Sequence, residues 1–222
     1  MHRRRVLAAA AALPVGLLAG CLDDDARHYE FDATPATVPA DAREEMGYSG
    51  EEPESFTLDT DATVAGADVT VTATTWMAQY ANQDRSAALF VASTPDATVA
   101  GHSLNPLVHG SDSEFLRRLL GEFRDRTDAD VDADEFDREE ATDVTILGEE
   151  TEAVTFETEV DVDADLVEES ETEAADSVPA YLHLATVSHD DDMVVLVGVH
   201  PQAVDERDAL LSLMESVEHG SA

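Results

Sequence analysis

Two uninterrupted apolar runs constrain the fold of this chain more than any other feature. Residues 87–92 read AALFVA and residues 193–199 read MVVLVGV, and polar, turn-forming residues lie on either side of both. Runs of this length without a charged side chain are typical of strands that are covered on both faces. Both runs are therefore expected to be central strands of a sheet.

Alternating segments predict hairpins around these central strands. Residues 69–77 alternate apolar residues with threonines, which is the period of a strand with one wetted face. Residues 142–147 and 152–160 flank a second turn, and residues 178–188 lead into the second apolar run through the turn 189–192. Two short strands are also expected, an edge strand at 29–33 and a further one at 99–104.

The same alternation assigns side chains to the faces of the sheet. Trp76 is expected on the face opposite Val71, because residues five apart in a strand point to opposite sides. The hairpin 142–160 is expected to present one inner face, which consists of Val144, Ile146, Val154 and Phe156.

Three segments carry helical signals. Residues 39–46 begin with proline and end before Gly47, residues 111–124 begin with capping-box spacing, and Asp205 is expected to cap a last helix. The apolar face of that last helix consists of Leu210, Leu213, Met214 and Val217. Helices set among hairpins, without regular strand–helix–strand alternation, favour an α+β fold: an antiparallel sheet with two or three helices packed on it.

The N-terminal segment has the layout of an export signal. Arg3, Arg4 and Arg5 precede an apolar run of 14 residues, from Val6 to Ala19, whereas a membrane span needs about 20. The arginine pair fits the twin-arginine pattern, and the general secretory route stays open as the alternative.

A lipid anchor is predicted directly after this run. Leu18, Ala19, Gly20 and Cys21 fit the lipobox of bacterial and archaeal lipoproteins, in which small residues precede the cleaved bond and the cysteine thiol takes the lipid. Cys21 is the only cysteine, so an intramolecular disulfide is excluded. The chain is therefore expected to be exported and anchored by Cys21 to the outer face of the cell membrane.

The charge of the chain indicates a salty environment. All twelve basic residues are arginine, and the nine that follow the signal stand against 50 acidic residues, a formal charge of −41. Such a charge destabilises a compact state in dilute solution, and the repulsion is screened when the Debye length falls to about 3 Å in 1 M salt. The composition thus favours a halophilic protein that loses its fold when salt is removed, and it opposes binding to nucleic acid.

These signals divide the chain into three parts. Residues 1–20 form the signal peptide, residues 21–40 an acidic lipid-anchored tether with an edge strand, and residues 41–219 a single α+β domain. Residues 163–177 carry seven acids and are expected to be a solvated loop within that domain.

Two sets of residues are weak candidates for metal ligands. Asp128, Asp130, Asp132 and Glu139 occupy positions 1, 3, 5 and 12 of a calcium-loop pattern. Ala133 stands where that pattern needs glycine, and partial matches arise by chance in so acidic a stretch. The second set, at the last hairpin, consists of His183, His189, His200 and Asp191; there, ordinary hydrogen-bonded strand histidines are the simpler interpretation.

The sequence also resembles a known family. The stretches 85–107, 144–156 and 181–220 are similar to those of a haloarchaeal lipoprotein family known only as a domain of unknown function. The resemblance implies a halophilic envelope protein with a lipid anchor and implies no catalytic residue or cofactor. At the level of fold alone, hairpins followed by a closing amphipathic helix are loosely similar to the Mog1 and PsbP proteins.

Function is left between three hypotheses. The leading one is a non-catalytic binding or envelope-accessory domain, since neither a nucleophile elbow nor a phosphate-binding glycine loop occurs in the sequence. The alternatives are a secreted enzyme with an unrecognised site and a weak divalent-cation binder.

Overall fold

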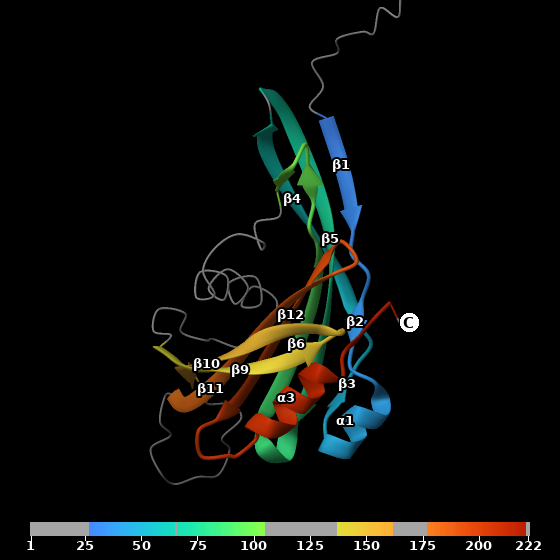
Figure 1. Ribbon diagram of the computed structural model, residues 1–222. Coiled ribbons are helices and arrows are strands. Elements are labelled where there is room, and N and C mark those ends of the chain that lie inside the picture. Colours follow the sequence, from blue (N-terminus) through green and yellow to red (C-terminus); the bar gives the residue numbers. More distant parts are fainter. Residues whose placement is uncertain (1–26, 65, 105–136, 162–176, 221–222) are drawn as a thin grey trace, which may run out of the picture.

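A computed structural model describes residues 27–64, 66–104, 137–161 and 177–220. Within these residues nine strands form one sheet, in the order β1-β5-β6-β12-β11-β10-β9 (Figure 1). β1 and β6 pair with successive parts of one edge of β5, and β3 and β4 pair with its other edge. Their bounds are β1 Arg27–Asp32, β3 Ser49–Gly50, β4 Glu54–Val64, β5 Ala67–Asn82, β6 Ala87–Pro95, β9 Asp137–Ile146, β10 Glu149–Asp161, β11 Ser177–His189 and β12 Asp192–Pro201.

The two apolar runs form the centre of this sheet, as expected. β6 pairs with β5 and β12, and β12 pairs with β6 and β11, all antiparallel. The hairpins β4–β5, β9–β10 and β11–β12 also form where the alternation predicts them.

Strand β1 departs from the expected antiparallel pattern. It pairs in parallel with residues 69–74 of β5. β6 pairs only with residues 76–82 of β5, so the rest of that edge is open to another strand. No tight turn joins β1 to β5, and nothing therefore fixes its direction as antiparallel.

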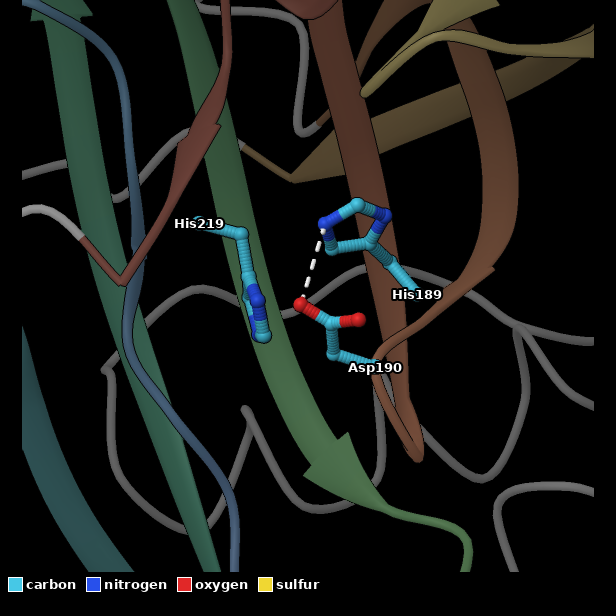
Figure 2. A group of neighbouring side chains, drawn as sticks. All are labelled: His189, Asp190 and His219. Carbon is cyan, nitrogen blue, oxygen red and sulfur yellow. Dashed lines mark ion pairs between the residues drawn. The ribbon is translucent and has the colours of Figure 1, made fainter.

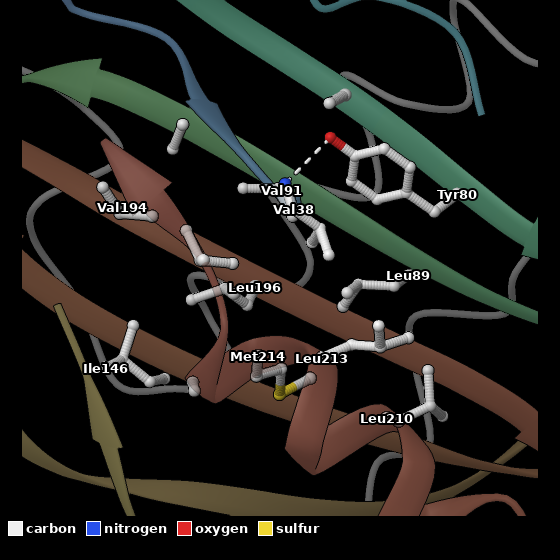
Figure 3. Close-up of a cluster of buried hydrophobic side chains, with 14 of the residues drawn as sticks. Val38, Tyr80, Leu89, Val91, Ile146, Val194, Leu196, Leu210, Leu213 and Met214 are labelled. Atoms are coloured by element: carbon white, nitrogen blue, oxygen red, sulfur yellow. Dashed lines mark hydrogen bonds between the residues drawn. The ribbon is translucent and has the colours of Figure 1, made fainter. Parts of the chain in front are cut away.

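One face of the sheet, here called the helix face, is covered by two helices and a small second sheet. The helices are α1 (Ala40–Met46) and α3 (Arg207–Glu215), and the second sheet pairs β2 (Ala36–Thr37) with β13 (Glu218–His219). The core beneath them includes Tyr80, Leu89, Val91, Ile146, Leu196, Leu210, Leu213 and Met214 (Figure 3). Gly198 lets α3 approach, because a Cβ there would lie 3.2 Å from Leu210 and Met214.

The opposite face carries two further apolar clusters. One joins Phe156, Leu182, Leu184, Val195 and Val197 across β10, β11 and β12. The other places the small hairpin of β7 (Thr98–Val99) and β8 (His102–Ser103) against Val69 and Val71 of β5. Trp76 faces the helix side, opposite Val71, as predicted.

Three expectations are corrected. Val144 and Ile146 belong to the core of the helix face, whereas Val154 and Phe156 belong to the opposite face. The two-residue turn at Leu147 pairs Ile146 with Glu149, so odd-numbered residues of β10 share a face with even-numbered residues of β9.

The other two corrections concern a strand and a cap. Residues 98–103 form the β7–β8 hairpin and not one strand, since Ala100 and Gly101 turn the chain with φ of 51° and 81°. Helix α3 begins after Glu206, which makes no side-chain capping bond, so Asp205 is not the cap. The predicted buried residues Leu210, Leu213, Met214 and Val217 are confirmed.

The α+β expectation holds in its general form, with the sheet dominating the described residues. Helix α1 follows Pro39 and ends at Gly47, whose φ is 76°. The predicted helix at 111–124 and nearly all of the acidic loop at 163–177 lie outside the described residues. No helix among the described residues is long and apolar enough to span a membrane.

Candidate metal centre at the end of the last hairpin

The turn between β11 and β12 presents three consecutive carboxylates and a histidine. His189 pairs with Asp192 across a two-residue turn in which Asp190 and Asp191 have φ of 48° and 68°. Positive φ at both central residues is the backbone of a type I′ turn, which asparagine and glycine adopt with least strain. Aspartate at both positions costs stability, and such strain tends to persist where side chains have a function.

The C-terminal strand delivers a second histidine to the same place. β13 runs antiparallel to β2, which pairs His219 with Ala36, and the Gly220 N–H donates to the Pro35 carbonyl over 3.0 Å. This short sheet carries the chain from the end of α3 across the helix face. His219 therefore reaches a hairpin tip that lies about thirty residues earlier in the chain.

Asp192 holds the ring of His219 in one orientation. The His219 Nε2 lies 3.0 Å from Asp192 Oδ2 and 3.3 Å from Ser93 Oγ, and the Thr34 N–H donates to the same carboxylate oxygen over 2.7 Å. The side chains of His219 and Asp192 are only 3% and 6% exposed. Because Nε2 donates its proton to a carboxylate, Nδ1 of the neutral ring keeps its lone pair.

His189, Asp190 and His219 bring three ligand atoms together. One atom from each lies within 4.8 Å of the others, and Asp190 Oδ2 is 3.5 Å from His189 Nε2. The two imidazole rings meet edge to face with centroids 5.3 Å apart. Figure 2 shows His189 and Asp190 at the hairpin tip and His219 facing them from the other side.

The three ligand atoms have to move slightly closer together before they can bind one metal ion. Ligand atoms about 2.1 Å from a tetrahedral Zn²⁺ are roughly 3.4 Å apart, so ligand atoms that lie as much as 4.8 Å apart have to approach by up to about 1.4 Å. Asp190 is the group free to move, since its side chain is 83% exposed and it lies at the tip of the turn. His219, held by Asp192, provides the fixed position.

A cavity of about 410 Å³ opens beside His189 and Asp190. Asp96, Asp191 and Asp192 line it together with His189 and Asp190. Carboxylates crowded around one opening attract cations, and the attraction strengthens in poorly solvated surroundings. The cavity therefore favours entry of a positively charged ion toward His189 and Asp190.

His183 and His200, the other histidines of the candidate set, lie elsewhere and contact each other, in agreement with the simpler interpretation of hydrogen-bonded strand histidines. Their Nε2 atoms are 3.1 Å apart, and the rings are stacked. His200 Nδ1 lies 3.0 Å from the Pro201 carbonyl oxygen, which only accepts, so this nitrogen carries a proton. His183 Nε2 then donates to His200 Nε2, and His183 Nδ1 accepts from the Thr155 hydroxyl over 2.9 Å.

The environment of this buried pair keeps His183 neutral. Burial, the neighbouring His200 and, to a smaller extent, Arg207 lower the pKa of His183 from 6.5 to about 4. Arg207 is held beside the pair by Glu140 and Thr142 at 2.8 and 2.6 Å. All four ring nitrogens have hydrogen-bond partners or a shared proton, so none is available to a metal ion.

The remaining predicted residues do not join the cluster. Asp191 lines the cavity without belonging to the group of three. Glu139 is exposed in β9. Asp128, Asp130 and Asp132 lie outside the described residues, as do Cys21 and the export signal, so the calcium loop and the lipid anchor stay predictions.

His219 is the residue that sequence reasoning missed. It lies on a strand of two residues that pairs with another of two residues, and no periodicity develops over so short a length. The length of the strand does show that His189 is not a partner of His183, because six residues of a strand span about 20 Å.

Comparison with known proteins gives a family and a distant structural likeness. The family described as "Domain of unknown function (DUF6517)" matches residues 35–218, and a search of curated proteins finds no match. Among solved structures, the solution structure of cyanobacterial PsbP (CyanoP) from Synechocystis sp. PCC 6803 is similar at 12% identity and a TM-score of 0.34. That match covers 84% of this chain and 92% of the other, and agreement at this level transfers neither ligand nor partner.

Proposed function

We propose that this chain, which belongs to the family described as a domain of unknown function, binds one divalent transition-metal ion through His189, Asp190 and His219. The family description names no activity, so the proposal is argued from the residues of the chain itself. The convergence of two imidazoles and a carboxylate within 4.8 Å carries the proposal. Three protein ligands leave one tetrahedral position for water.

The choice of ligands sets the class of metal. Imidazole nitrogen suits Zn²⁺, Cu²⁺, Ni²⁺ and Fe²⁺, whereas Mg²⁺ and Ca²⁺ prefer oxygen ligands. A site made only of carboxylates would fill with whichever cation is most abundant in a salty medium. His189 and His219 provide the selectivity, and Asp190 lowers the electrostatic cost of holding the ion.

The location proposed for this binding is the outside of the cell. The arginine-rich signal, the lipobox ending at Cys21 and the acidic composition all support an exported, lipid-anchored protein that works at high salt. Twin-arginine and general secretory export are both compatible with this location. A metal-binding domain on a tether would take up or hold ions at the membrane surface without catalysing a reaction.

Calorimetry tests the metal proposal. The full chain carrying Cys21→Ser, which removes the only thiol, is titrated with ZnCl₂ and with CaCl₂ in molar KCl. We expect one zinc ion per chain and at least tenfold weaker binding of calcium. His189→Ala should abolish the zinc heat, because this partly exposed ring contributes a ligand and little to the core.

The chain offers a matched control for that variant. His28 lies 3.8 Å from Glu30 on an exposed part of β1, so it is a histidine beside a carboxylate without a second imidazole. His28→Ala should leave zinc binding unchanged. Unaltered zinc stoichiometry in His189→Ala would contradict the proposal, as would equal losses in the two variants.

A further inference from the structure

A second concavity lies on the helix face, and Glu218, the neighbour of His219 in β13, is among the residues that line it. It has a volume of about 660 Å³ and lies between the start of α1, the segment that joins β3 to β4, and the part of β5 that holds Trp76 and Tyr80. Gly50 permits this segment to run against the sheet, because a Cβ there would lie 2.5 Å from the Tyr80 ring. We call this concavity the Arg43 groove.

Arg43 is positioned in the groove with unused hydrogen-bonding capacity. Its guanidinium carbon lies 4.9 Å from the centre of the Tyr80 ring, and Tyr80 is itself fixed by the Val38 N–H, which donates to its hydroxyl over 3.1 Å (Figure 3). Nη1 donates to the Gly50 carbonyl over 3.3 Å. Nε is buried without a partner.

An arginine in this state lacks the partner that it binds best. Guanidinium groups pair with carboxylates through two parallel hydrogen bonds, and in the described part of this very acidic chain no carboxylate lies within ion-pair distance of Arg43. A buried donor without an acceptor costs free energy. Because Arg43 lines the groove and has no ion pair among the described residues, its guanidinium is available to a carboxylate that comes from outside the chain.

The charge around the groove restricts what can carry that carboxylate. Glu51, Glu52 and Glu218 line the same concavity, and the whole chain has a formal charge of −38. A simple anion is therefore repelled, whereas a ligand with a positive group near the glutamates and a negative group at Arg43 is not. The groove selects a zwitterion.

The remaining walls are apolar. Trp76, the only tryptophan of the chain, is half-buried, and it lines the groove together with Pro35, Pro39 and Pro53. Rigid rings of this kind bury an apolar or aromatic group with little loss of conformational freedom.

From these observations we propose that the Arg43 groove binds a free α-amino acid with a large apolar or aromatic side chain. Arg43 pairs with the α-carboxylate, the glutamates face the α-ammonium, and Trp76 packs against the side chain. None of the three proposed metal ligands lines this groove, so the amino acid and the metal ion would have different contacts.

The emission of Trp76 provides a direct test, since no other tryptophan contributes. The full chain in molar KCl with EDTA, which keeps metal ions out, is titrated with L-phenylalanine while the indole is excited selectively. We expect a saturable change in emission. L-phenylalaninamide, which lacks the carboxylate, and N-acetyl-L-phenylalanine, which lacks the ammonium, should each bind at least tenfold more weakly.

Two conservative variants locate the carboxylate contact. Arg43→Lys keeps the charge but loses the planar fork, so it should weaken L-phenylalanine binding at least tenfold, with circular dichroism confirming the fold. Arg27→Lys, on the exposed strand β1, should change nothing. The proposal is overturned if L-phenylalanine produces neither emission change nor heat, if the amide binds as tightly as the amino acid, or if Arg43→Lys binds like the unaltered chain.

Discussion

The two ends of the β11–β12 hairpin each hold a pair of histidines, and the pairs have opposite properties. At one end His183 and His200, 1% and 3% exposed, exchange hydrogen bonds with each other and with neutral partners. At the other end His189 and His219 meet beside Asp190 and Asp192. Two imidazoles that lie close together are therefore not enough to make a metal site. A candidate ligand pair also needs a ring nitrogen on each histidine whose lone pair is not used in a hydrogen bond.

The largest expected difference between the two ends is in stability. His183→Ala leaves the Thr155 hydroxyl and His200 Nε2 without partners inside the protein and opens a cavity, so it should lower the free energy of unfolding by about 3 kcal/mol. His189→Ala should lower it by no more than about 0.5 kcal/mol. Urea unfolding in molar KCl measures both, and equal losses would remove the distinction.

The second difference is in the response to pH. The pKa of His183 falls from 6.5 to about 4 in the fold, so on acidification the unfolded chain takes up this proton first. Stability from this group is complete above pH 6.5 and is lost as the pH falls toward 4, by roughly 3 kcal/mol in total.

A variant isolates this contribution from the many carboxylates that titrate nearby. His183→Gln keeps hydrogen-bonding groups but cannot take up a proton, so its unfolding free energy should change less between pH 6.5 and 4 than that of the unaltered chain. The exposed His28→Gln serves as control. Parallel pH profiles for all three proteins would show that His183 is not held neutral.

The third prediction concerns the carboxylate that orients His219. Asp192→Asn keeps the shape but weakens the hold on Nε2–H, and loss of such a partner usually lowers metal affinity 10- to 100-fold. Asp96→Asn is the matched control: Asp96 lines the same cavity but accepts from the Thr98 hydroxyl. Zinc calorimetry should therefore show a large loss for the first variant and less than about threefold for the second.

The smallest predicted effect is at the turn itself. Asp191 has φ of 68°, a conformation that glycine adopts without strain. Asp191→Gly should raise the free energy of unfolding by roughly 0.5 to 1 kcal/mol and leave zinc affinity almost unchanged. A large loss of zinc binding would instead show that Asp191 is a ligand and would contradict the proposed set of three ligands.

The strands were predictable because the pattern of apolar and polar residues within each segment is enough to indicate a strand. The unbroken runs in β6 and β12 indicate burial on both faces, and alternation marks the flanking hairpins. The parallel direction of β1 was not predictable, since alternation is the same for either direction. The faces of Val144 and Phe156 required the turn register, which a sequence of alternating residues leaves open by one position.

The site was harder to predict than the sheet because it depends on contacts between distant segments. His189 was named from its place in the last hairpin, but its partner His219 arrives through the short β2–β13 pairing. His183, His189 and His200 were grouped as one candidate set, and the structure brings together only His183 and His200. Their exclusion as ligands follows only from hydrogen-bond partners that the fold supplies, Thr155 and the Pro201 carbonyl.

Nuclear magnetic resonance of isotope-labelled histidine rings during a zinc titration tests the contrast between the two pairs most directly. With less than one equivalent of zinc, the ring signals of His189 and His219 should change while those of His183 and His200 stay in place. Movement of the His183 and His200 signals, or no change at His189 and His219, would contradict the assignment of the open pair as the metal ligands.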